Sequence, residues 1–138
     1  MPLSWETWRL GREAWSLAQP VSVVLSPDES RSLDLERAVL VVLHHLASLP
    51  PGTVDDATLR AVTAAHHIQL TALTDARGAG PAIVPTSGPA TTLPEVRIAQ
   101  RGLAEQAKSA GVEAAQGDFA MLFAAIGAGT RQQMGALR

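Results

Sequence analysis

Four long stretches of this chain place apolar residues every three to four positions, which is the spacing of one face of an α-helix. They run from about 26 to 49, 55 to 77, 94 to 115 and 119 to 137. Further apolar residues extend around the first stretch, so we expect that helix to be central. The pattern predicts an all-α fold with four apolar faces: Leu35, Val39, Val42, Leu46 and Leu49; Leu59, Val62, His66, Leu70 and Leu73; Val96, Ala99, Leu103, Ala107, Ala110 and Ala114; Phe119, Leu122, Phe123, Ile126, Thr130, Met134 and Leu137.

Capping residues mark the beginnings of these helices. Ser26, Thr53 and Thr92 are each followed three residues later by a carboxylate, the arrangement of a capping box. Gly117 and Asp118 predict a helix end followed at once by a new N-cap, and one long kinked helix through this point is the alternative. Six acids fall in predicted first turns, where the helix dipole stabilises each by about 0.3–1 kcal/mol, and we interpret them as caps: Asp28, Glu29, Asp55, Asp56, Glu95 and Asp118.

The connections between the predicted helices are short, long and short. Residues 50–52 end the first helix, and the Gly- and Pro-containing residues 78–93 cannot continue the second. Fully extended, residues 78–93 reach about 50 Å, whereas a 20-residue helix is about 30 Å long. The sequence therefore predicts a four-helix bundle over 26–138, made of two antiparallel hairpins and one long crossover, which is the connectivity of ferritin-like bundles.

Small residues predict that the last two helices approach each other closely. The third helix carries alanines along its apolar face, and the fourth carries Gly127 and Gly129. A glycine inside a helix costs about 1 kcal/mol relative to alanine, and close packing is the expected compensation.

All three tryptophans of the chain lie in its first fifteen residues. A short additional helix is predicted over about 4–19, followed by an extended piece over 21–25, so residues 1–25 form a separate N-terminal region. On that helix Trp5, Trp8, Arg12 and Trp15 share one face. This face either closes one side of the bundle or docks on a partner protein or membrane interface. Two Arg and two Glu leave the helix without a basic charge, which favours a protein over anionic lipid.

Composition excludes several classes of function. The net charge is -2 with a pI near 6.0, so no basic field predicts binding to nucleic acid. Cysteine is absent, which excludes disulfides, thiolate metal sites and a cysteine nucleophile. Apolar runs such as 38–43 are far shorter than the roughly 20 residues of a membrane span, and no export signal is recognised. We expect a cytoplasmic protein as written, and a secreted or envelope protein if a signal has been removed.

The four histidines are the natural candidates for a metal site. Di-iron bundles use Glu-x-x-His on two helices, but no carboxylate stands three residues before any histidine here, which excludes a standard di-iron site. The pairs His44–His45 and His66–His67 lie on adjacent predicted helices, and imidazole is a common metal ligand. Their predicted positions are staggered by about 9 Å along the helices, which opposes a shared ion. We interpret His66 as a hydrogen-bonded core residue and His67 as facing water.

Other catalytic templates are also missing. The chain contains no G-x-S-x-G nucleophile elbow, no phosphate-binding Walker loop and no dinucleotide fingerprint. We therefore expect neither an enzyme nor a bound cofactor.

Two stretches resemble a known family. Residues 64–73 read AAHHIQLTAL and residues 117–128 read GDFAMLFAAIGA. With these stretches, about 36–137 resembles the ferritin-like domain of actinobacterial proteins, often lipoproteins, of unknown function. The resemblance implies a bacterial four-helix domain. Where such domains tend to place a late histidine this chain has Gln133, and the lipid-attachment cysteine of the lipoproteins is missing.

Together these observations predict a non-catalytic helical interaction module that binds a protein partner or associates with itself. The expected contact residues are Trp5, Trp8, Arg12 and Trp15, or an exposed face of the bundle. The alternative is a bundle that binds a small ligand or a metal ion, centred on His66 with His44, His45 and His67 as further candidate ligands.

Overall fold

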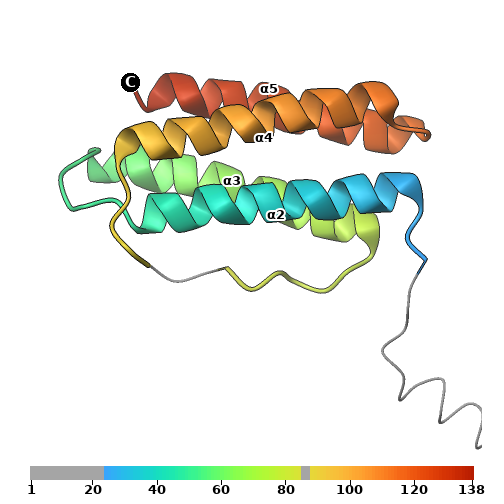
Figure 1. Cartoon of the computed structure of the whole chain (residues 1–138), viewed down its shortest axis with the longest axis horizontal. Coiled ribbons are helices and arrows are strands. Elements are labelled where there is room, and N and C mark those ends of the chain that lie inside the picture. The colour runs from blue at the N-terminus through green and yellow to red at the C-terminus, as the bar shows by residue number, and fades with distance from the viewer. Residues whose placement is uncertain (1–23, 85–87) are drawn as a thin grey trace, which may run out of the picture.

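Four α-helices build the part of the chain that the structure describes (Figure 1). This computed structural model describes residues 24–84 and 88–138, in which no strand occurs. The helices are α2 (Pro27–Ala47), α3 (Asp56–Arg77), α4 (Leu93–Glu113) and α5 (Gly117–Ala136). The predicted all-α four-helix architecture is confirmed. The predicted helix over 4–19 lies outside the described residues.

Cross-helix hydrogen bonds define the directions of the helices. Ser32 Oγ near the start of α2 donates to the carbonyl of Leu73 near the end of α3, at 3.1 Å, so these helices are antiparallel. At the other end, the Thr91 amide donates to the Ser48 carbonyl at 3.0 Å, so α4 begins where α2 ends. Figure 1 shows the chain leaving α3 and passing along the bundle towards α4. Two antiparallel helix hairpins are thus joined by a crossover that runs the length of the bundle. Membership of the ferritin-like family stays a prediction.

Of the three predicted capping boxes, the one at Ser26 is complete and the one at Thr92 is half formed. Ser26 Oγ accepts from the Glu29 amide and the Glu29 carboxylate accepts from the Ser26 amide, both at 3.1 Å. Thr92 Oγ1 accepts from the amide of Glu95. The box at Thr53 is wrong, because Asp55 is the N-cap of α3. Asp55 accepts from the amide of Thr58, whereas Thr53 donates its hydroxyl proton to the Pro50 carbonyl inside the loop.

The junction between α4 and α5 differs from the prediction. Helix α4 ends at Glu113 and α5 begins at Gly117, so the two helices are separate and the kinked alternative is wrong. Gln116 is the N-cap of α5 and its side chain makes no capping bond, so Asp118 is not the cap. The turn before α5 is instead held from across the bundle: Asp28 accepts from the amides of Ala115 and Gln116 at 3.0 and 2.9 Å.

Asp28 makes its bonds to Arg31 and to another part of the bundle, whereas Ser26 caps α2. The carboxylate is 2 % exposed and also accepts from Arg31 at 2.9 Å. The amide of Ala115, together with the Gln116 amide and Arg31, lowers the pKa of Asp28 below its usual value of 3.8 against the opposing effect of burial. This one side chain joins the start of α2 to the α4–α5 turn.

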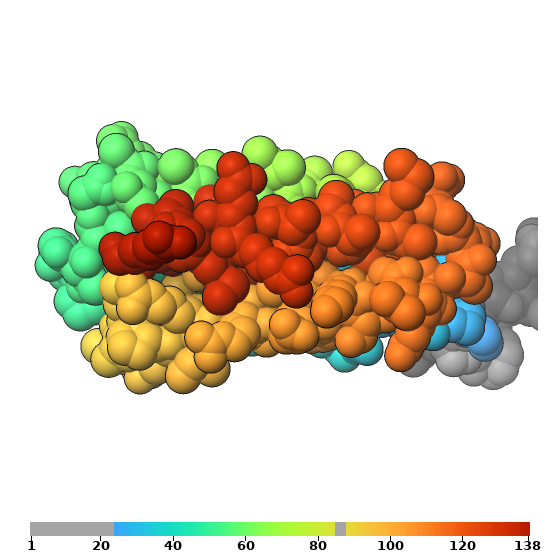
Figure 2. Space-filling model, turned by 90° about the horizontal axis from the view of Figure 1, so that it is seen from above, coloured from blue at the N-terminus to red at the C-terminus, as the bar shows by residue number. Residues whose placement is uncertain are grey.

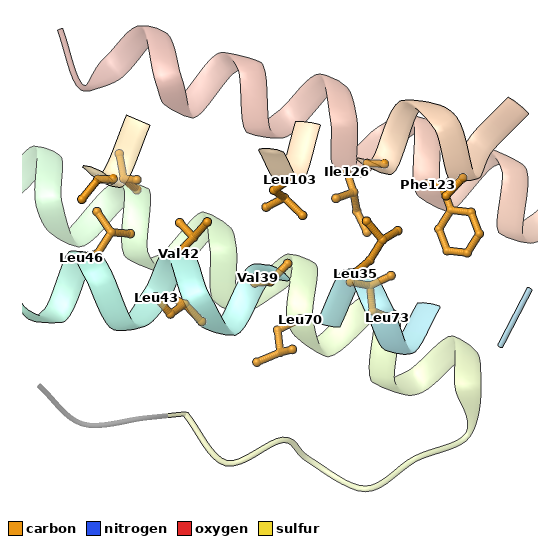
Figure 3. Close-up of a cluster of buried hydrophobic side chains, with 14 of the residues drawn as sticks. Leu35, Val39, Val42, Leu43, Leu46, Leu70, Leu73, Leu103, Phe123 and Ile126 are labelled. Carbon is orange, nitrogen blue, oxygen red and sulfur yellow. The ribbon is translucent and has the colours of Figure 1, made fainter. Parts of the chain in front are cut away.

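The apolar faces meet in one continuous core (Figure 3). Of the predicted α2 face, Leu35, Val39, Val42 and Leu46 are buried, and α2 also buries Leu43. A Cβ atom on Gly127 would lie 3.6 Å from Ala107 Cβ, so the predicted close approach of α5 to α4 is confirmed at this position. Gly129 instead faces Gln69 of α3.

A buried ion pair adds a second link between α2 and α3. Arg77 donates from Nε and Nη2 to the two carboxylate oxygens of Glu36, at 2.7 and 2.9 Å. The Glu36 side chain is 5 % exposed, and its hydrogen bond raises the pKa of Arg77. Without Arg77, the Glu36 carboxylate would be a buried charge with no partner, which destabilises a fold strongly.

Candidate functional site

A chain of polar side chains crosses the middle of the core around His66. His66 of α3 is fully buried, and its Nδ1 lies 2.8 Å from Oε1 of Gln69 on the next turn. Its Nε2 lies 3.1 Å from Nε2 of Gln100 on α4. Gln69 Nε2 donates to Thr130 Oγ1 of α5 at 3.1 Å, and Thr130 donates to the Ile126 carbonyl at 2.7 Å. Three helices are therefore joined by one series of hydrogen bonds.

The partners of His66 define its protonation. The Gln69 carbonyl oxygen can only accept, so the proton of the ring is on Nδ1, and Nε2 accepts from the Gln100 amide group. Burial lowers the pKa of His66, the Gln69 hydrogen bond opposes that effect, and the charge of nearby His67 adds to the lowering. His66 is thus a neutral core histidine, as the sequence predicts.

One polar atom in this network has no partner. Gln100 is fully buried, and its Oε1 is the buried side-chain atom without a hydrogen bond in the described part of the protein. Leaving a buried acceptor unpaired costs about 1–3 kcal/mol. Because both ring nitrogens of His66 already have glutamine partners, a metal ion at His66 would have to displace one of them.

His44 and His45 hold the crossover against the end of α2. His45 Nδ1 lies 3.1 Å from Thr91 Oγ1, and the Ser48 hydroxyl accepts from the Gly88 amide at 3.0 Å. The His44 ring lies against Gly88 so closely that a Cβ atom on that glycine would be 2.8 Å from His44 Nε2. These two histidines have a structural place at the end of the bundle, away from His66 at the centre of α3.

His67 lies on the outer side of α3. The sequence predicts that His67 faces water. The side chain is only partly exposed, because the crossover covers part of it. Together with Thr71, Thr74 and Asp75 it lines a hollow of about 160 Å³ beneath the crossover. Over residues 24–84 and 88–138, no three His, Asp or Glu side chains come together in a group that could hold a metal ion.

An apolar groove lies between α3 and α5, next to this network. In the space-filling view α5 lies between α3 and α4 (Figure 2). The groove has a volume of about 280 Å³. Gln69 forms part of its lining and Gln133 its polar edge, and the other lining residues are apolar or glycine: Ala65, Ile68, Ala72, Leu122, Ala125, Ile126 and Gly129.

A large exposed apolar side chain lines this groove. Ile68 is 70 % exposed. Large apolar side chains on other faces are exposed too, such as Ile98, which is 67 % exposed. Exposed apolar side chains alone therefore do not distinguish the groove. The groove differs because an exposed apolar side chain is combined there with a concave apolar surface.

The sequence did not identify Gln69, Gln100 or Thr130 as a connected set. The signal was present, because Gln69 follows His66 by three positions, Gln100 follows Val96 by four and Thr130 follows Ile126 by four. Polar residues in the register of an apolar stripe indicate a buried polar network. Trp5, Trp8, Arg12 and Trp15 lie outside the described residues, so their role in binding stays a prediction.

Comparisons with protein-family models, with curated proteins and with solved structures find no match to this chain. The resemblance to ferritin-like actinobacterial domains stays a prediction. No helix among the described residues combines the length and hydrophobicity that crossing a membrane requires.

Proposed function

We propose that this protein is a non-catalytic helical interaction module, and that it binds an amphipathic helix of a protein partner in the groove between α3 and α5. The observation that supports this function is the lining of the groove, in which every residue except Gln69 and Gln133 is apolar or glycine. Concave apolar surfaces with exposed borders are typical of binding sites.

The spacing of the lining residues favours a helix as the occupant. On α3 the groove is lined at 65, 68, 69 and 72, and on α5 at 122, 125, 126, 129 and 133. These are the positions of one face of each helix, so the groove runs along two neighbouring helices. A third helix lying between them buries its apolar face at i, i+3, i+4 and i+7, which is the helix-in-groove mode of recognition.

Site-specific photo-crosslinking in the native host tests this function. Ile68 is replaced by the photoreactive residue p-benzoylphenylalanine, and Ile98, equally exposed on α4, carries the same replacement as the control. We expect an intermolecular adduct from position 68 and none from position 98. Peptide mapping of the adduct is expected to locate the link in a partner segment with apolar residues at helical spacing.

Two other results would contradict this function. Equal adducts from both positions indicate non-specific contact, and no intermolecular adduct from position 68 indicates that no partner uses the groove. An adduct to a second copy of the chain, together with a dimer in sedimentation equilibrium, would show that the chain associates with itself through the groove instead of binding a different protein.

A further inference from the structure

We infer that the groove between α3 and α5 has a resident occupant in the same chain: residues 4–19, with the face of Trp5, Trp8 and Trp15 turned into it. This inference rests on the proposed function, because it names the helix that a partner has to displace. The N-terminal region then occupies the docking site instead of forming a separate one.

The size of the groove favours side chains over a metabolite. Its volume of about 280 Å³ is below the roughly 300–1,000 Å³ typical of small-molecule pockets. Ala65, Ala72, Ala125 and Gly129 provide its depth, because none of them has a side chain beyond Cβ. Large flat indoles, which bury about 150–250 Å² each, fill such a shallow apolar surface.

The lengths of the two surfaces agree. Trp5 and Trp15 are ten residues apart, which is about 15 Å along a helix. The groove extends from Leu122 to Gln133 on α5, eleven residues, or about 16 Å. A helix with tryptophans over this span therefore covers the groove from one end to the other.

The position of α2 allows the segment to reach the groove. Helix α2 begins beside the α4–α5 turn, as the bonds from Asp28 to Ala115 and Gln116 show, and the groove begins two turns further along α5. Residues 20–25 extend over up to about 20 Å, which is comparable to two helix-packing distances of 8–10 Å. A tether of this length keeps the segment at an effective concentration of about millimolar.

Intrinsic fluorescence tests the inference directly, because all three tryptophans of the chain lie in the segment. We expect the emission maximum of the native full-length protein to lie clearly to the blue of the guanidinium-unfolded protein, with iodide quenching reduced several-fold. Ile68→Lys is expected to shift the emission towards the unfolded value and to restore quenching. Ile98→Lys, at the matched exposed site on α4, is expected to change neither.

A second pair of variants tests whether a change in tryptophan emission results from misfolding. Ala125→Lys places a charge on the α5 wall of the groove, and Ala128→Lys places it on an exposed position of α5 outside the groove. Only the first is expected to expose the tryptophans, while far-ultraviolet circular dichroism stays unchanged in both. Solvent-exposed tryptophans in the native protein, or equal shifts in both members of each pair, would overturn the inference.

Dilution separates the same chain from a second copy. An emission maximum that stays constant as the protein concentration is varied from about 0.1 to about 100 μM supports docking within the chain. This range covers ordinary interface affinities. An emission that moves to the red on dilution assigns the occupant to another copy and overturns the inference.

These outcomes are distinct from those of the crosslinking experiment. Buried tryptophans without an intermolecular adduct leave the resident helix in place and contradict the proposed function. Exposed tryptophans with a partner adduct at position 68 contradict the resident helix and leave the proposed function supported.

Discussion

At the scale of single residues, the structure depends on a few polar side chains that make bonds far from their own position in the chain. His66 joins α4 to α3 through Gln100 and Gln69, and Asp28 joins α2 to the α4–α5 turn. Each sits where water is excluded, so each bond is costly to lose. Their protonation links the stability of the fold to pH.

Replacing His66 by alanine is expected to lower the free energy of unfolding by about 3–5 kcal/mol. The change removes a buried ring and leaves Gln69 Oε1 without a donor and Gln100 Nε2 without an acceptor. Urea denaturation followed by circular dichroism measures the loss. His67→Ala, at the partly exposed neighbour, is the control and is expected to cost much less.

The lowered pKa of His66 predicts a dependence of stability on pH. Below about 6.5 the unfolded chain binds a proton at His66 while the native state resists it, so the free energy of unfolding falls as pH falls. This slope is expected in the wild type and in His67→Ala but reduced in His66→Ala. An unchanged slope in His66→Ala would show that other groups cause it.

Asp28 predicts a separate effect in acid. Because the native pKa of Asp28 lies below 3.8, its stabilising bonds are fully present above that pH and are lost as pH falls through the native value. Asp28→Asn is expected to lower stability at pH 7 and to lose less on further acidification, as measured by guanidinium unfolding from pH 7 to pH 2. Asp34→Asn, at an exposed pair with Arg37, serves as the control, and an equal effect there would contradict a special role of Asp28.

At the scale of elements, each helix is docked by a contact at its end as well as by its apolar face. Ser48, His44 and His45 at the end of α2 hold the last residues of the crossover, and this contact positions the start of α4. The close approach of Gly88 to His44 leaves no space for a side chain.

Gly88→Ala is expected to destabilise the protein by up to about 1 kcal/mol, because its Cβ atom would overlap the His44 ring and that ring would have to move aside. Gly80→Ala, at a crossover position with open space, is expected to be neutral or to stabilise by up to about 1 kcal/mol. Combining Gly88→Ala with His44→Ala is expected to recover part of the loss in thermal unfolding. Additive effects of the two changes would contradict the overlap.

At the scale of the whole molecule, the long crossover lets two antiparallel hairpins pack side by side. Arg77 and Leu93, the residues on either side of it, lie at opposite ends of the bundle, about 30 Å apart for helices of this length. The groove and the polar network exist only because this packing brings α5 against α3.

Deleting residues 80–87 is expected to prevent folding as a monomer. The seven remaining crossover residues span about 26 Å at 3.3 Å per step, less than the bundle length, so α4 and α5 can pair only with another chain. Light scattering is expected to report a dimer or larger species. Inserting eight Gly and Ser residues after 86 is expected to leave a monomer with a loss of at most about 0.6 kcal/mol, and a monomeric deletion variant would contradict this account.

The sequence alone determined the four helices, their apolar faces, the crossover and the burial of His66. These features depend on neighbours in the chain: helical spacing, glycine and proline, and caps such as Ser26 and Thr92. At the α4–α5 turn the predicted cap was wrong, because this turn is held by the carboxylate of Asp28, which no local pattern contains.

Only the tertiary structure decided which faces meet and therefore which polar groups find partners. Gln69, Gln100 and Thr130 come from three helices, and Gly129 faces α3 and not α4, as a result of helix rotation and offset. The α3–α5 groove likewise depends on how two helices lie side by side. Helix periodicity specifies which side of each helix is apolar, whereas the pairing of those sides depends on packing between residues that are far apart in the sequence.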